Sequence, residues 1–191
     1  RLGALLVTLR PSLRLFFTDH MGATRPKKDL YHRWAYGKVT RLLSISEATR
    51  QRNLAAFPLP AERIRRLYLG IDPAPYAPCL DDQARTALRR ELGVPEGAVA
   101  TGLPGRLTPG KGQGVWVEAL ARLAETRPEL AWHGVLIGGL TAEEGSHEAH
   151  VAALRRRIDE LGLASWITFT GFRRDLPRLF EALEVVCVPS R

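Results

Sequence analysis

The chain has 191 residues, of which 45% are apolar and 25% charged, an ordinary globular composition with length for one domain or two small ones. Its two cysteines, Cys79 and Cys187, are far apart and lack metal-ligand spacing, which argues against a disulfide-rich secreted protein and favours a reducing cytoplasm. The longest apolar run, residues 2–9, is too short to cross a bilayer as a helix.

The net charge of +8 is concentrated in the first third of the chain. Residues 1–70 hold 14 lysines and arginines against 4 acidic residues, whereas residues 71–191 hold 14 against 16. This basic segment indicates a surface for anionic lipid headgroups or an acidic acceptor, although a merely solvated surface fits the counts equally well. Nucleic acid is not expected as a partner, because aromatic residues do not interleave the basic ones. The lipid interpretation would place the protein in the cytoplasm, at the inner face of the membrane.

Helices and strands are predicted to alternate along the first seventy residues. Their apolar spacing predicts helices over 2–10, 30–39 and 47–57, and strands over 13–18, 41–46 and 64–69. Alternation at this spacing is typical of an α/β fold with a parallel, doubly wound sheet. The chain begins at an arginine rather than a methionine and stops directly after a predicted strand, so we expect a piece of a longer chain.

A proline-rich stretch divides the chain into two predicted domains. Prolines at positions 73, 75 and 78 disfavour both a regular helix and a central strand. We therefore predict a first domain over residues 1–72, a linker over 73–80 and a second domain over 81–191. The second domain is expected to contain helices over 81–92, 113–126, 144–161 and 176–183, and strands beginning at 99, 134, 166 and 185.

A glycine-rich turn in the second domain is the strongest functional signal. A short apolar strand starting at residue 99 leads into Gly105-Arg106, and Lys111 stands just before the helix over 113–126. Glycines allow the backbone to approach a ligand closely, and a helix start offers unpaired N–H groups with a positive dipole. With two cations in the same turn, this pattern predicts an anion site, most simply for phosphates.

One candidate family for this turn is the P-loop nucleotide hydrolases. The spacing from Gly105 to Gly110-Lys111 satisfies most of that motif. However, Gly112 stands where the motif needs Ser or Thr to hold Mg²⁺. No strand carries a convincing Mg²⁺-binding aspartate either, so we interpret the match as incidental.

The order of motifs instead resembles the retaining glycosyltransferases of family four, the glycosyl transferases group 1, which have the GT-B fold. The shared motifs occur in order: Thr18-Asp19-His20, Ser44-Ile45-Ser46-Glu47, Gly70-Ile71-Asp72, Gly105-Arg106-Leu107, Lys111-Gly112, Gly138-Gly139, Leu161-Gly162-Leu163, Thr170-Gly171-Phe172 and Pro189-Ser190. Each motif is weak alone, but their order and spacing over about 120 residues are specific. One departure is Leu69, where the family usually has Asn. The family's early glycine loop and its paired glutamates would lie outside this chain.

The resemblance implies two Rossmann-like domains, of which the chain holds the second half of the N-terminal one and an incomplete donor-binding C-terminal one. It implies transfer of a sugar, with retained configuration, from a nucleotide-sugar to a hydroxyl of a glycan, lipid or small-molecule acceptor. Arg106 and Lys111 match the residues that stabilise the leaving diphosphate, and His20 matches a histidine facing the transferred sugar. The family needs no bound metal and no cofactor, since the nucleotide-sugar is a substrate.

The remaining predicted site residues also follow from the resemblance. Gly138 and Gly139 end a strand where the donor approaches closely. Phe172 and Arg173 follow a strand end where the family contacts the nucleobase, largely through its backbone. Ser190 belongs to the Pro-Ser motif after the last strand and is placed with the substrate-binding residues.

Two other functions stay open at the level of sequence. A GT-B epimerase or phosphorylase-like enzyme would bind a similar ligand, and a non-catalytic nucleotide-binding module would bind it without turnover. A metal site at His147, Glu148 and His150 is not expected, because no third ligand is fixed by the spacing and a solvated, acidic helix start explains the residues.

Overall fold

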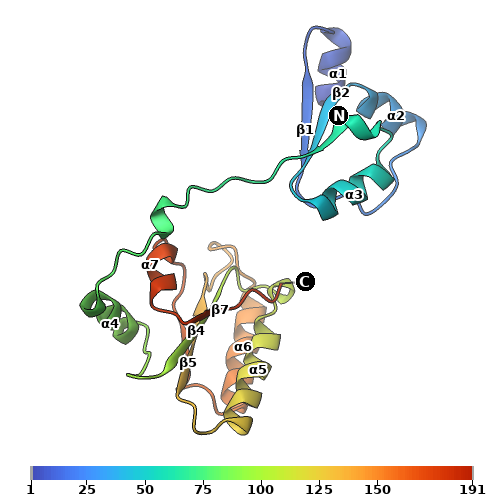
Figure 1. Cartoon of the computed structure of the whole chain (residues 1–191). Coiled ribbons are helices and arrows are strands. Elements are labelled where there is room, and N and C mark those ends of the chain that lie inside the picture. Colours follow the sequence, from blue (N-terminus) through green and yellow to red (C-terminus); the bar gives the residue numbers. More distant parts are fainter. Residues whose placement is uncertain (1, 191) are drawn as a thin grey trace. The chain divides into compact units, whose positions relative to one another are not determined.

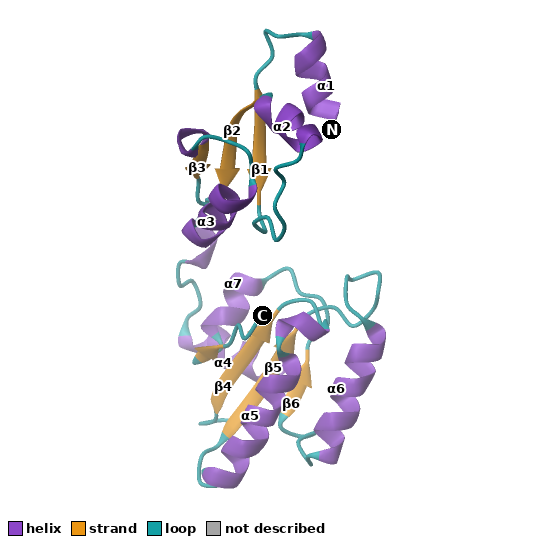
Figure 2. Cartoon of the chain, turned by 90° about the vertical axis from the view of Figure 1, so that its right-hand side faces the viewer, coloured by secondary structure: helices purple, strands orange, loops and turns teal. Residues whose placement is uncertain are grey.

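The computed structural model describes residues 2–190 and shows two compact units, one ending at Asp72 and the other beginning at Pro73 (Figure 1). Each unit is an α/β layer structure with its own parallel sheet, as Figure 2 shows. No helix within residues 2–190 combines the length and the apolar character needed to cross a membrane.

The first unit consists of a three-stranded sheet and three helices. Its elements are α1 (Leu2–Leu9), β1 (Leu15–Asp19), α2 (Leu30–Gly37), β2 (Val39–Ser44), α3 (Glu47–Ala56) and β3 (Ile64–Arg66), with strand order β1-β2-β3. Two helices begin at polar caps: Asp29 accepts a hydrogen bond from the His32 N–H (3.0 Å), and Ser46 accepts one from Thr49 (3.1 Å). Strand β2 is central, and its Leu42 is completely buried in the small core of this unit.

The start of β2 differs from the sequence prediction. We predicted a helix through Val39 and a strand from residue 41, but the helix ends at Gly37 and Val39 is the first strand residue, paired with Leu15. Glycine weakens a helix, and the side chain of Val39 gains burial in the core by joining the sheet.

The second unit is a three-layer α/β/α structure. Its elements are α4 (Asp82–Glu91), β4 (Val99–Pro104), α5 (Gln113–Thr126), β5 (Trp132–Ile137), α6 (Glu148–Glu160), β6 (Ile167–Phe169), α7 (Leu176–Glu181) and β7 (Val185–Val186). Short 3₁₀ turns lie at Ala74–Tyr76 and Pro109–Lys111 in this unit, and at Ala61–Arg63 in the first unit. The four parallel strands run in the order β6-β5-β4-β7.

Alternation along the central strand β5 builds a core on each face of this sheet. Leu136 packs with residues of α5 and α6 on one face, whereas Val135 and Ile137 pack with residues of α4 and α7 on the other (Figure 1). Each such fully buried aliphatic side chain contributes roughly 1.5–3 kcal/mol relative to exposure. The sheet is therefore held rigidly between two helical layers, which fixes the loops at its carboxyl edge.

Helix α6 begins four residues later than predicted. We predicted a start at Glu144, but residues 140–146 form a folded turn in which the Glu144 carboxylate accepts a hydrogen bond from the Leu140 N–H (2.7 Å). Gly145 has a left-handed backbone (φ 82°), which interrupts the helix before Glu148. The consequence is a compact loop over the carboxyl edge of the sheet.

Residues 73–80, which were predicted to form a linker, pack onto α7. Glu181 of α7 accepts hydrogen bonds from the N–H groups of Cys79 and Leu80, both at 3.0 Å, and Tyr76 stacks on Phe180. The Cys79 thiol also donates to Glu181, and this hydrogen bond raises the pKa of the thiol.

Candidate donor-binding site

The carboxyl ends of three neighbouring strands meet in a tight glycine arrangement. Gly105 follows β4 and its N–H donates to the Ile137 carbonyl at 2.9 Å, while Gly138 follows β5 and forms an isolated bridge to Gly171. A Cβ on Gly138 would lie 2.1 Å from the Gly105 carbonyl oxygen, so only glycine allows this approach. Open parallel sheets place their ligands at this edge.

A cavity of about 130 Å³ opens at this edge and collects most of the predicted site residues. Its lining residues are Gly105, Arg106, Ile137, Gly138, Gly139, Glu144, Phe172, Arg173 and Leu176. Six of these nine were predicted from the sequence as substrate-binding or catalytic. The structure thus brings together residues that are up to 68 positions apart in the chain.

The Arg106 and Lys111 side chains are cations without protein counterions. Within residues 2–190, neither side chain forms an ion pair with a carboxylate or a hydrogen bond. The stem of Arg106 passes Gly145, where an added Cβ would lie 3.1 Å from its Cδ. Two unneutralised cations beside a cavity attract an anion.

The start of α5 adds backbone donors to the same turn. Gly112 adopts a left-handed backbone (φ 78°) and no side chain caps the helix. The N–H groups of residues 113–115 find no hydrogen-bond acceptor within the described chain, and the first helical bond runs from Trp116 to the Gly112 carbonyl. A helix start of this kind presents partial positive charge to a ligand.

Two predicted residues lie outside the cavity but beside the turn. Lys111 ends the short 3₁₀ turn before α5. Ser190 follows Pro189, whose carbonyl oxygen lies so close to Gly112 that a Cβ there would approach it to 2.4 Å. The chain segment after β7 therefore packs against the glycine turn, although Ser190 does not line the cavity.

His20 belongs to the first unit, at the carboxyl end of β1. Its side chain is exposed, and the neighbouring Asp19 accepts a hydrogen bond from the Met21 N–H at 3.2 Å. The role of His20 stays a prediction.

The Arg173 guanidinium is already paired, unlike that of Arg106. It forms two hydrogen bonds to Asp175 (2.8 and 2.7 Å) and one to Glu91 (2.6 Å). These hydrogen bonds raise the pKa of Arg173 and hold the pKa of Asp175 below its usual range. Arg173 therefore fixes the loop after β6, and its charge is already compensated by Asp175 and Glu91.

Sequence reasoning missed three polar residues that shape the site. Glu144 lines the cavity, Ser146 accepts a hydrogen bond from the Leu107 N–H (2.9 Å), and Gln113 is completely buried with its amide donating to the Arg106 carbonyl (2.9 Å). Burial at the first position of a helix would have marked the polar Gln113 as a candidate site residue, but a single sequence does not show burial.

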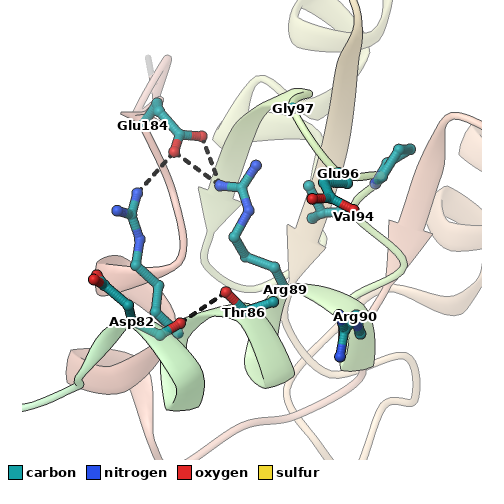
Figure 3. Close-up of a pocket in the computed structure, with 10 residues that line it drawn as sticks. Asp82, Thr86, Arg89, Arg90, Val94, Glu96, Gly97 and Glu184 are labelled. Atoms are coloured by element: carbon teal, nitrogen blue, oxygen red, sulfur yellow. Dashed lines mark hydrogen bonds and ion pairs between the residues drawn. The ribbon is translucent and has the colours of Figure 1, made fainter.

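A second cavity of about 380 Å³ lies where α4 faces the amino ends of β4 and β7. Figure 3 shows the Arg89 guanidinium directed at Glu184, whose carboxylate also pairs with Arg85 at 2.8 Å and accepts from the Ala100 N–H at 2.7 Å. Burial alone would raise the pKa of Glu184, but these hydrogen bonds and cations outweigh it and lower the pKa. Glu184 neutralises Arg85 and Arg89, so these two arginines hold α4 against the strand ends, unlike the unpaired Arg106.

Glu148 and His150, which the sequence analysis considered as metal ligands, contact other groups of the protein. The Glu148 carboxylate accepts a hydrogen bond from the Ala142 N–H at 3.0 Å, and His150 faces Gln113. In the part of the chain that the structure describes, no group of three His, Cys, Asp or Glu side chains is arranged to hold a metal ion.

Comparison with known proteins identifies the family. Residues 99–191 match the family described as glycosyl transferases group 1. These residues belong to the group 1 glycosyltransferases. The resemblance to the glycosyl transferases group 1 that was drawn from the motif order is thereby confirmed for these residues.

Curated relatives that this chain matches are glycosyltransferases by name. The D-inositol 3-phosphate glycosyltransferase of Stackebrandtia nassauensis is 37% identical over 125 residues, which are 63% of this chain and 27% of that protein. The lipopolysaccharide core mannosyltransferase LpsB of Rhizobium meliloti is 27% identical over 183 residues, 96% of this chain and 47% of that protein. This chain thus spans about a quarter to a half of the relatives it matches.

Solved structures confirm the predicted fold class. The Anabaena protein HepE in complex with UDP superimposes with a TM-score of 0.79 at 26% identity, covering 98% of this chain and 50% of HepE. WaaG, a glycosyltransferase of lipopolysaccharide biosynthesis, matches with a TM-score of 0.68 at 19% identity and shares the fold. The chain is a mixed α/β structure that corresponds to part of a GT-B glycosyltransferase.

Proposed function

We propose that this chain carries the donor-phosphate half of a retaining glycosyltransferase, which moves a sugar from a nucleotide-sugar to a hydroxyl acceptor without a bound metal. The observation that carries the proposal is the pair of unneutralised cations, Arg106 and Lys111, on a glycine turn beside the cavity. The unpaired N–H groups at the start of α5 supply further positive charge in the same turn.

The chemistry of glycosyl transfer explains why cations belong at this turn. When the bond between the sugar and the nucleoside diphosphate breaks, negative charge builds up on the departing phosphate oxygens. Fixed cations facing those oxygens stabilise the transition state more than the ground state, which accelerates the reaction. Removing one such group costs on the order of 10²–10³ in turnover at comparable oxyanion sites. Arg106 and Lys111 would thereby replace the charge that a metal ion provides elsewhere.

The donor is proposed to be a nucleoside diphosphate sugar. HepE, whose solved structures are 25–26% identical to this chain, has been solved with UDP and with UDP-glucose. In this chain Arg173 and the exposed Phe172 line the cavity together with Gly105 and Arg106, and the nucleobase would rest against them. Gly138 and Gly139 would let the donor approach the strand end closely, and Ser190 would lie next to it.

His20 is proposed to contact the transferred sugar from the first unit. An imidazole at the carboxyl end of a parallel strand can donate a hydrogen bond to a sugar hydroxyl or stabilise positive charge at the reacting carbon. The paired glutamates expected by resemblance lie outside residues 1–191, so we expect this chain alone to bind a donor without turnover.

The basic first unit is proposed to face an acidic acceptor or an anionic membrane at the inner face. Its fourteen cations among residues 1–70 carry this proposal. Sedimentation with phosphatidylglycerol vesicles should retain the protein, whereas phosphatidylcholine vesicles should not. Equal binding to both vesicle types would remove the membrane from the proposal.

Calorimetric titration of the chain with UDP, GDP and ADP, each with and without EDTA, tests the proposed function. We expect saturable binding of at least one diphosphate, unchanged by EDTA, with the nucleotide-sugar competing for the same site. Product analysis by NMR with the longer gene product then separates the alternatives: transfer with retention supports the proposal, whereas epimerised donor, phosphorolysis or binding without turnover contradicts it. Absence of diphosphate binding also refutes it.

A further inference from the structure

We propose that Gln113 is the positioning residue that aims Arg106 at the donor phosphates. This inference rests on the proposed function, because it assigns how the cation of that site is held. Gln113 contacts the backbone of the glycine turn through a hydrogen bond and does not itself line the cavity.

Gln113 occupies an unusual place for a polar side chain. It is the first residue of α5 and is completely buried. Its Nε2 donates to the Arg106 carbonyl at 2.9 Å, and its Oε1 faces His150 Nε2 of α6 at 3.4 Å. The amide therefore links the helix start, the glycine turn and the neighbouring helix α6. Burying an amide is costly unless it is hydrogen-bonded, so these bonds define one arrangement of the turn.

The next residue of the turn is held from the other side. The Leu107 N–H donates to the Ser146 hydroxyl at 2.9 Å, and its carbonyl accepts from the His147 N–H at 3.0 Å. The Leu107 side chain is completely buried in the core between the sheet and α5. The backbone on both sides of the Arg106–Leu107 peptide is thus fixed by buried partners, while the Arg106 side chain is the exposed part.

A fixed backbone beneath an exposed side chain explains how Arg106 can be preorganised. Arg106 has no protein counterion to orient it, so its direction depends on the backbone that carries it. Preorganised charge stabilises a transition state because no reorganisation is needed during the reaction. A misplacement of about 1 Å at such a group costs on the order of a hundredfold. Loss of the Gln113 bond frees the carbonyl one bond away from the Arg106 Cα.

A double-mutant cycle tests whether Gln113 acts through Arg106. The variants are Gln113→Met, which keeps the volume and removes both hydrogen bonds, Arg106→Ala, and the two combined. UDP and uridine are titrated against each, and Gln83→Met, on the exposed face of α4, is the matched control. We expect Gln113→Met to weaken UDP binding about tenfold or more and to leave the affinity for uridine within about twofold of wild type. In the Arg106→Ala background, Gln113→Met should not weaken UDP binding further.

Each contrary result refutes a different part of the proposal. A wild-type chain that binds no UDP refutes the proposed function and this inference together. Wild-type binding with additive losses in the cycle refutes only the role of Gln113. A parallel loss of UDP and uridine affinity shows that Gln113 merely supports the fold. If Gln113→Met does not fold, Ser146→Ala takes its place in the cycle, because its hydroxyl holds the adjacent peptide, and the same outcomes decide.

Discussion

The substitution Gly138→Ala tests the close packing of two strand ends that forms the floor of the site. The added Cβ would lie 2.1 Å from the Gly105 carbonyl oxygen and 3.1 Å from its carbon, both backbone atoms. A carbon and an oxygen of this kind normally approach to about 3.3 Å, so the Gly105 peptide must move by roughly 1 Å. Overpacking of this kind costs about 1–3 kcal/mol.

Urea unfolding followed by tryptophan fluorescence measures this cost. Three of the four tryptophans, at positions 116, 132 and 166, lie in the second unit and report on it. With a urea dependence of about 2 kcal/mol per molar for a unit of this size, a 2 kcal/mol loss lowers the midpoint by about 1 M. The displaced turn also carries Arg106, so UDP affinity should fall on the order of a hundredfold.

Gly110→Ala is the matched control for this prediction. Gly110 lies in the same turn, is exposed and has open space around its Cα, so its substitution should change the midpoint and the UDP affinity little. A Gly138→Ala protein with wild-type stability and UDP affinity would show that the two strand ends do not pack as described. Equal losses in both variants would show that any added side chain in this region disturbs the turn.

Three further predictions concern the second unit. Gly112→Ala should destabilise by roughly 1–3 kcal/mol, read from the same urea midpoint, because alanine resists the left-handed backbone and would approach the Pro189 carbonyl to 2.4 Å; an unchanged midpoint would contradict this packing. Glu184→Gln should lower the melting temperature at pH 7, since it leaves the partly buried Arg89 without its carboxylate. The difference in melting temperature between variant and wild type should shrink in acid, because the wild-type carboxyl is then protonated. A difference that stays constant with pH would contradict this prediction. Burial lowers the pKa of His133, so the unfolded chain binds a proton that the folded chain resists, and stability should fall as pH drops below about 6.5; His133→Gln should reduce that slope, and an unchanged slope would contradict the assignment.

The fold class could be predicted from sequence because it follows from local signals, whereas most of the cavity lining was predicted from the family resemblance. Glycines at strand ends and apolar runs at strand spacing mark the carboxyl edge of a parallel sheet, which is where Gly105, Gly138 and Phe172 meet. The motif order then supplied the family, which the chain's match over residues 99–191 confirms.

Long-range contacts account for what the sequence did not reveal. The pairing of Arg173 with Glu91 joins residues 82 positions apart, and it gives the Arg173 side chain a structural role that the sequence did not indicate. The burial of Gln113 likewise depends on α6 packing across it. The late start of α6 depends on the Glu144 carboxylate finding N–H donors in its own loop, which competes with helix formation.

The most direct test of the donor-phosphate site is the effect of its two cations on UDP binding. Arg106→Ala and Lys111→Ala should each weaken UDP by about 10- to 100-fold, the 1.5–3 kcal/mol of a hydrogen bond to a charged group, and each should reduce the salt dependence of binding. Arg122→Ala, which removes an exposed arginine further along α5, should leave both unchanged. If UDP binds the two site variants as tightly as the wild-type chain, with the same salt dependence, the turn between β4 and α5 does not hold the phosphates.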